Sequence, residues 1–379
     1  MIPLPATAEQ GRPRRRRAKS VNPAALLRLP DWWHYKLPPL LGVAYLMLAG
    51  SPTAAAWAGT PVAPGVAAMA LGLFLASAFA TAAWGHLVND LADREADRRA
   101  GRSSPLAELR APARTALLVL FFAAAIVPWL FLPSAPLAWG ALAAELLLLA
   151  VYSLPPLRLK ERGFAGVLAD ALYGHALPMT ITVGLFPALR GASAIAGLLA
   201  AALVGWKFAQ GLCGALVSQI RDRRADLRAG TLTFVRTRGA LGAQRLVRFA
   251  LLPAQFVLFV AALALLAPRA PFLLPAYALF LALRLFQIHR LHGHGRNFYR
   301  IGYPGYALLN DFHERWLPLV ALVALVAADR RYLVLVVAHL LLFRNGLGEL
   351  ARGLGRAVAR RPERSERSER SERPERSQR

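Results

Sequence analysis

Five of the nine aspartates in this chain lie in two short segments that could bind a divalent cation. The first segment, residues 89–101, reads NDLADREADRRAG, and in a helix its aspartates would stand at i, i+3 and i+7 on one face. The second, residues 218–230, reads SQIRDRRADLRAG and places its two aspartates at i and i+4. Carboxylates this close repel one another unless a cation lies between them, and hard oxygen ligands suit Mg²⁺ together with substrate phosphates. We therefore predict a site for Mg²⁺ and a diphosphate that is formed by Asn89, Asp90, Asp93, Asp97, Asp222 and Asp226.

The two segments also resemble each other, which indicates an internal repeat. Aligned without gaps they agree at 7 of 13 positions, pairing Asp93 with Asp222 and Asp97 with Asp226, while Gln219 stands opposite Asp90. Each copy follows a long apolar stretch and is expected to open a loop. A single copy could equally be a solvated segment whose aspartates pair with nearby arginines. Two copies in matching positions favour the catalytic interpretation.

The elements that must position these aspartates are predicted to be transmembrane helices. Hydrophobic residues make up 56% of the 379 residues, charged residues only 18%, and the mean hydropathy is +0.40. A soluble domain usually carries about 25% charged residues, and about 20 apolar residues cross a bilayer. This apolar composition excludes disorder, a coiled coil and a disulfide-stapled secreted fold, and Cys213, the only cysteine, can form no internal disulfide. We expect an all-α, multi-pass protein with spans near 37–51, 66–88, 114–132, 137–153, 166–187, 192–217, 247–267, 271–288, 312–328 and 332–343.

The distribution of basic residues predicts how this bundle is oriented. If every second connection is cytoplasmic, 41 of the 46 lysines and arginines fall on that side, as the positive-inside rule requires. We therefore expect the protein to span the cell membrane with its N-terminus and both aspartate segments on the cytoplasmic side. The net charge of +25 therefore reflects topology and contact with anionic lipid, and it does not indicate a nucleic-acid partner.

The repeat divides the predicted helices into two sets of four around a central cavity, because each aspartate segment follows the second helix of a set. We expect three regions along the chain. Residues 1–24 form a basic and disordered arm, residues 25–345 the membrane domain, and residues 346–379 a basic low-complexity tail that has little apolar surface to bury.

A third segment, VYSLPPLRLKERG at 151–163, completes a recognisable set. With N-D-x-x-D-x-x-x-D in the first segment and D-x-x-x-D in the second, it resembles the UbiA-type intramembrane prenyltransferase superfamily, and its loop is closest to the chlorophyll synthase and homogentisate prenyltransferase branches. The resemblance spans roughly residues 25–328. It implies a bundle of transmembrane helices, nine by the family pattern or ten by the count of predicted spans. It also implies Mg²⁺-dependent transfer of a prenyl group from a polyprenyl diphosphate onto a lipid-soluble, usually aromatic, acceptor.

The resemblance also implies roles for residues near the aspartates. Arg158 and Lys160 are expected to help neutralise the diphosphate, with Arg99 and Arg228 as the equivalent residues of the two repeats. Tyr152 could face the allylic cation or the diphosphate, or it could be a tyrosine of the membrane interface.

Ionisable residues inside predicted spans are costly and often functional. Lys207 could point into the cavity towards the substrate, or it could extend to an interface. Asp170 could contact the acceptor, act as the base that removes a ring proton, or form a local structural pair. Glu145 lies in the middle of its span, and there we expect a buried polar contact.

Two other function classes fit part of the pattern. A transporter would explain the helices and the repeat but needs no paired aspartate clusters. A membrane transferase that makes phospholipids would concentrate its aspartates in a D-G-x-x-A-R motif, which this sequence lacks.

Overall fold

A computed structural model describes residues 22–49, 62–99, 104–190, 197–229, 232–268, 270–292, 310–344 and 348. Residues 1–21 of the predicted arm and all of the predicted tail except Gly348 lie outside these ranges. The described residues form helices and no strand, so the predicted all-α class is confirmed. The helices are α1 (Pro23–Leu26), α2 (Trp33–Ala49), α3 (Pro64–Arg99), α4 (Ala111–Ile126), α5 (Pro136–Ser153), α6 (Phe164–Ala171), α7 (Leu177–Ala188), α8 (Gly197–Ala229), α9 (Phe234–Arg238), α10 (Ala240–Leu246), α11 (Leu252–Leu266), α12 (Leu273–His292), α14 (Leu317–Ala328) and α15 (Leu333–Leu342).

Among the described residues, five stretches of helix are long and apolar enough to cross a membrane, as expected for a membrane protein. They are Pro64–Glu95, Ala111–Leu130, Pro136–Ser153, Gly197–Arg224 and Ala240–Leu266. Helices that are apolar all round bury one side against their neighbours and expose the other to lipid. The bilayer explains why large apolar side chains such as Leu120, Leu147 and Phe249 are exposed.

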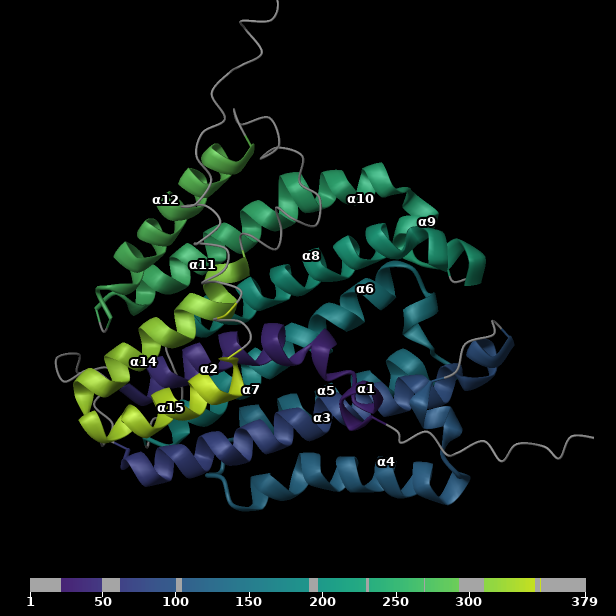
Figure 1. Ribbon diagram of the computed structural model, residues 1–379, viewed down its shortest axis with the longest axis horizontal. Coiled ribbons are helices and arrows are strands. Elements are labelled where there is room, and N and C mark those ends of the chain that lie inside the picture. The colour runs from purple at the N-terminus through teal and green to yellow at the C-terminus, as the bar shows by residue number, and fades with distance from the viewer. Residues whose placement is uncertain are drawn as a thin grey trace, which may run out of the picture.

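The helices pack as a single layered bundle (Figure 1). α2 lies between α7 and α14, α5 packs against α7 and α3, and α4 covers the outer side of α3. α8 packs against α6 on one side and α11 on the other. Short π-helical turns join α6 to α7 and α10 to α11, at Leu172–Ala176 and Val247–Leu251, so each of these pairs continues as one interrupted rod.

The structure corrects the expected position of the aspartate segments and leaves the number of membrane crossings open. The aspartate segments were expected to open loops, but both continue the helix before them, as the C-terminal turns of α3 and α8. Arg/Ala-rich sequence sustains a helix well, so leaving the apolar region does not end it. The last two spans form separate helices, α14 and α15. The total number of crossings and the division into two four-helix sets stay predictions.

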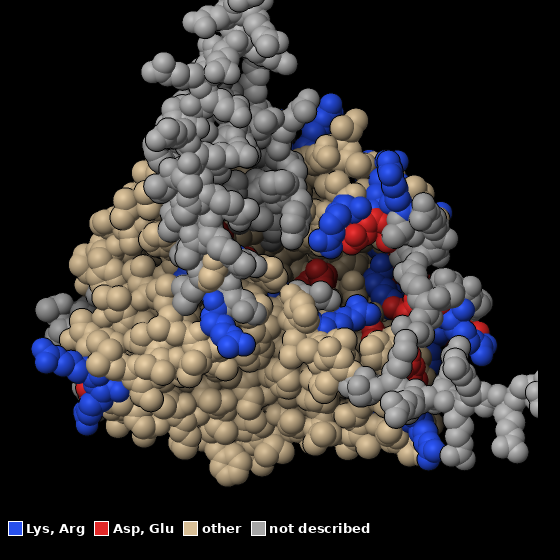
Figure 2. All heavy atoms as spheres, in the orientation of Figure 1, with Lys and Arg blue, Asp and Glu red and all other residues tan. Residues whose placement is uncertain are grey.

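Charged side chains gather at one end of the bundle, where α3 and α8 end, and the flank of the visible face is largely uncharged (Figure 2). A smaller charged group lies at the opposite end. This separation agrees with the predicted spans, because charges belong outside the hydrocarbon. The assignment of the aspartate end to the cytoplasm remains a prediction.

Candidate active site

The loop after α5 connects the two aspartate segments. Its backbone pairs with the strand-like residues after α8, where Gly163 N donates to Leu232 O over 3.3 Å and Gly163 forms a bridge with Thr233. Gly163 has a φ of +55°, a left-handed conformation that favours glycine. Phe164 and Phe234 then pack at a tilt with ring centroids 5.5 Å apart. These contacts hold the loop beside the second aspartate segment.

The same loop reaches the first aspartate segment through two cations. Lys160 Nζ lies 2.6 Å from Asp93 Oδ1 and 2.8 Å from Asn89 Oδ1. Arg158 Nη2 donates to Asp93 Oδ1 over 2.9 Å, and its Nε pairs with Glu161. Both basic residues that were expected near a diphosphate therefore point at the end of α3.

The three aspartates of α3 do not converge on one point. Asp90 is buried and forms an ion pair with Arg28 at 2.5 Å, whereas Asp93 faces the loop cations. Asp97 lines a separate pocket with Arg94 and other polar residues. In the described part of the chain no three acidic, histidine or cysteine groups are close enough together to hold a metal ion. The reason is geometric, because seven residues of helix raise Asp97 about 10 Å above Asp90.

The second segment is more open. Asp222 is exposed and contacts Arg221, with Nε and Oδ1 3.2 Å apart. Burial raises the pKa of Asp226, and the neighbouring Asp222 raises it further, while a hydrogen bond from Thr233 opposes both effects. Gln219, which replaces the first aspartate of the repeat, accepts a hydrogen bond from Val235 N over 3.2 Å. It therefore anchors the loop that follows α8.

Lys160 is the most enclosed cation of the loop, with 13% of its side chain exposed. Burial lowers its pKa below the ordinary lysine value, although the carboxylate of Asp93 opposes this shift. The side chains of Arg99 and Arg228 lie outside the described part of the structure.

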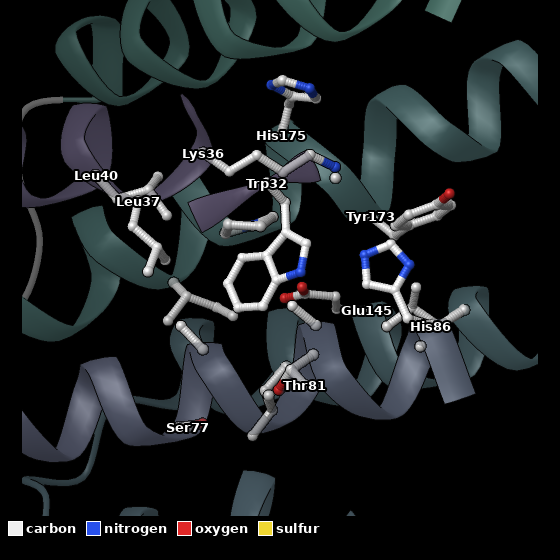
Figure 3. Close-up of a pocket in the computed structure, with 18 of the residues that line it drawn as sticks. Trp32, Lys36, Leu37, Leu40, Ser77, Thr81, His86, Glu145, Tyr173 and His175 are labelled. Atoms are coloured by element: carbon white, nitrogen blue, oxygen red, sulfur yellow. The ribbon is translucent and has the colours of Figure 1, made fainter. Parts of the chain in front are cut away.

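A cavity of about 280 Å³ begins beside these residues and extends into the bundle (Figure 3). It lies between α2, α3, α5 and the rod of α6 and α7. At its mouth Ser153 Oγ and Asn89 Oδ1 are 3.3 Å apart. Below the mouth the side chain of Leu149 on α5 lies against Gly85 of α3, and a Cβ on Gly85 would lie 2.7 Å from Leu149 Cδ2. A larger residue at position 85 would therefore require the Leu149 side chain to move.

Aromatic and apolar residues close the inner end of the cavity. Trp129 Nε1 donates to Ser77 Oγ over 2.8 Å, and Ser77 Oγ donates to Ala125 O over 2.6 Å. Phe74 lines the same region and packs edge-on against Phe186. From Asn89 to Phe74 is 15 residues of helix, which makes the cavity about 22 Å deep.

The predicted intramembrane residues lie in this cavity. Lys207 is 1% exposed and donates to Gln210 over 2.6 Å, so it faces the interior and does not extend to an interface. Asp170 both lines the cavity and accepts a hydrogen bond from Tyr173 over 2.6 Å. Tyr152 lies at the mouth and packs edge-on against Tyr173, with centroids 5.1 Å apart.

Arg28, Trp32 and Lys36 line the cavity and were not predicted as site residues. All of them precede residue 37, where the first apolar span was expected to begin. α2 begins at Trp33, so Lys36 belongs to the bundle. The sequence did offer a signal for Arg28 and Lys36, because both are basic residues directly before an apolar span. The positive-inside rule already accounted for their charge, so they were not assigned to the site.

Comparisons with known proteins agree with this geometry. A family model described as the UbiA prenyltransferase family matches residues 38–298. Two solved structures of a UbiA homolog from Archaeoglobus fulgidus, one bound to DMAPP and Mg²⁺ and the other to GPP and Mg²⁺, resemble the fold with TM-scores of 0.54 and 0.53. Each is 16% identical, and each alignment covers 80% of this chain and 98% of the other. The sequence matches no curated protein.

Proposed function

The chain belongs to the UbiA prenyltransferase family and is a membrane prenyltransferase, and we propose that it moves a prenyl group from a polyprenyl diphosphate onto a lipid-soluble, aromatic acceptor. We place the diphosphate at the ends of α3 and α8, on the cytoplasmic side of the cell membrane. The acceptor and the allylic end of the prenyl chain meet in the cavity below.

The oxygen donors at this end fit Mg²⁺ in kind. Carboxylates are hard ligands, and Mg²⁺ is usually held by one or two of them together with substrate phosphates. Asp90, Asp93, Asp97, Asp222 and Asp226 are the residues that would hold it, and Asn89 supplies a further oxygen. When bound, Mg²⁺ neutralises the diphosphate and makes it a better leaving group. The UbiA homologs bound to prenyl diphosphates and Mg²⁺ support this assignment.

The cations of the chain bind the diphosphate directly. Lys160 and Arg158 already converge at the mouth of the cavity, and Arg28 adds a third positive charge beside Asp90. Each of them can exchange a carboxylate contact for a phosphate oxygen while keeping a charge-assisted hydrogen bond. They orient the substrate and balance the negative charge that develops as its allylic C–O bond breaks.

The cavity keeps water away from the allylic cation that forms when the diphosphate leaves. Leu37, Leu40, Phe74, Leu142 and Ile181 give it an apolar wall. Water would convert the allylic cation into an alcohol, and an apolar, enclosed wall prevents this loss. Tyr152 lies between the diphosphate end and this wall, where it can face the developing charge.

The observation that carries this proposal is the convergence of Lys160 and Arg158 on Asn89 and Asp93 at the mouth of an enclosed cavity. The test is to incubate the purified protein in membranes with Mg²⁺, labelled prenyl diphosphates of several lengths and a panel of aromatic acceptors. We expect a prenylated acceptor that is lost with EDTA and restored by Mg²⁺. Release of diphosphate with a prenyl alcohol as the sole product, whatever the acceptor, would argue against the proposal.

A further inference from the structure

Glu145 lies inside the cavity and makes no hydrogen bond or ion pair with the residues that the structure describes. It belongs to α5, is 8% exposed and lines the cavity together with residues of α2 and α3. In Figure 3 its carboxylate points into the space that Trp32 and Lys36 also face. Among the described residues it forms no hydrogen bond and no ion pair, so the buried polar contact expected from the sequence is missing. A carboxylate in the middle of a membrane is costly unless something receives it.

Lys36 faces the same space and is likewise not hydrogen-bonded to any described residue. Its Nζ lies 5.9 Å from the centroid of the Tyr173 ring, and a Cβ on Gly174 would lie 2.7 Å from that Nζ. The positive charge of Lys36 balances the negative charge of Glu145 across the cavity, but the oxygen atoms of Glu145 can still accept a hydrogen bond. The cavity therefore presents an acceptor group that a ligand can satisfy.

The depth of Glu145 fits an acceptor ring. Eight residues of α5 separate it from Ser153 at the mouth, which is about 12 Å along the helix. Reacting carbon atoms must come within about 3–3.5 Å of each other. The interval between the diphosphate end and Glu145 is therefore long enough for the allylic carbon and one aromatic ring, with a ring substituent directed at the carboxylate.

The walls around this interval favour an aromatic ring over an aliphatic alcohol. Trp32 lies on one wall and stacks with His86, with ring centroids 6.4 Å apart. Tyr173 lies on another wall. Aromatic side chains pack well against a flat ring in offset or edge-on arrangements.

We propose that Glu145 accepts a hydrogen bond from a hydroxyl group on the acceptor ring, and so selects phenolic acceptors over their alkylated analogues. Lys36 compensates the charge of the carboxylate from the opposite wall. The inference rests on the proposed function, because it assigns the same cavity to the acceptor. It adds the chemical class of the acceptor and the residue that reads it.

Binding of two matched probes tests the inference without catalysis. 1-Methoxynaphthalene is 1-naphthol with a methyl group in place of the hydroxyl hydrogen, so it lacks the donor, and the binding of both to the purified protein in lipid nanodiscs can be measured by equilibrium dialysis. The wild type should bind the naphthol about 10- to 150-fold more tightly, as expected for a hydrogen bond to a charged group. Glu145→Met should abolish this preference while leaving the affinity for the ether largely unchanged. Glu108→Met, at an exposed carboxylate outside the cavity, should keep it.

An equal preference for the naphthol in wild type and Glu145→Met would overturn the proposal, and so would the absence of any preference in the wild type. If Glu145→Met does not fold, Glu145→Gln decides, because a neutral amide should lower the preference several-fold and an unchanged preference refutes the role of the carboxylate. Since no prenyl diphosphate is present, failure here leaves prenyl transfer intact. Failure of the transfer assay with the binding preference intact would instead count against the proposed function.

Discussion

Replacing Lys160 with alanine tests whether the loop after α5 binds the diphosphate. The ammonium contacts Asp93 and Asn89 at 2.6 and 2.8 Å and has 13% of its side chain exposed, so water only weakly screens its charge. A hydrogen bond between charged groups contributes about 1.5–3 kcal/mol. Its loss should therefore raise the KM for the prenyl diphosphate by about 10- to 150-fold. The KM for the acceptor should change little, because the acceptor lies deeper in the cavity.

The fold should tolerate this substitution. Asp93 keeps its ion pair with Arg158 at 2.9 Å, so the change leaves no buried charge without a partner. Steady-state kinetics in nanodiscs, with each substrate varied in turn, give the two KM values. Arg245→Ala is the matched control, since this exposed residue of α10 should bind only lipid phosphate. A KM for the diphosphate within twofold of the wild-type value, in correctly inserted protein, would refute the reasoning.

The same residue predicts a pH dependence. Burial lowers the pKa of Lys160 below its ordinary value of 10.5. The ammonium that binds the diphosphate is present below this lowered pKa and is lost as the pH rises through it. The affinity for the diphosphate should therefore fall on the alkaline side. Lys160→Arg, which stays charged, should remove this fall, and an identical pH profile for both proteins would contradict the explanation.

Three further outcomes are expected. Asp222→Ala should lower kcat/KM at least about a hundredfold, as loss of a principal electrostatic stabiliser does; full activity at saturating Mg²⁺ would exclude the second segment from the site. A cysteine at Thr237 should react with a membrane-impermeant maleimide from the cytoplasm and one at Ser134 from the opposite side, and labelling of both from one side would overturn the predicted topology. Trp129→Ala should open the inner end of the cavity and extend activity to longer prenyl chains. Trp139 packs on Trp129 with ring centroids 5.4 Å apart but does not line the cavity, so Trp139→Ala should leave the chain-length range unchanged. Unchanged chain-length profiles for both tryptophan variants would show that Trp129 does not limit the chain.

The parts of the site that the sequence predicted are those set by local pattern. The aspartates of α3 are spaced by helical geometry, and Arg158 and Lys160 follow α5 in a short loop stiffened by Pro155 and Pro156. Both features depend on neighbours within a few turns. The long apolar spans likewise predicted the helical bundle, because a bilayer permits few other arrangements.

The parts that the sequence did not predict depend on contacts between distant residues. Arg28 reaches Asp90 across 62 positions, and no local spacing indicates that pair. Lys36 was taken as part of the segment before the first span, since the start of an apolar pattern locates a helix end only within a few residues. The cavity position of Glu145 depends on which face of α5 meets α3, and an evenly apolar helix does not specify its faces.

The backbone bridge between Gly163 and Thr233 ties together segments that are far apart in the sequence. The loop that carries Lys160 is thereby fastened to the end of α8, while its ammonium is fastened to the end of α3. A ligand that shifts one aspartate segment therefore changes the free energy of ligand binding at the other segment through this shared loop. Thermodynamic reciprocity then requires that occupancy of either aspartate segment alter the affinity of its counterpart by the same factor. The two segments should therefore titrate with divalent cations as a cooperative pair, and not as two independent sites.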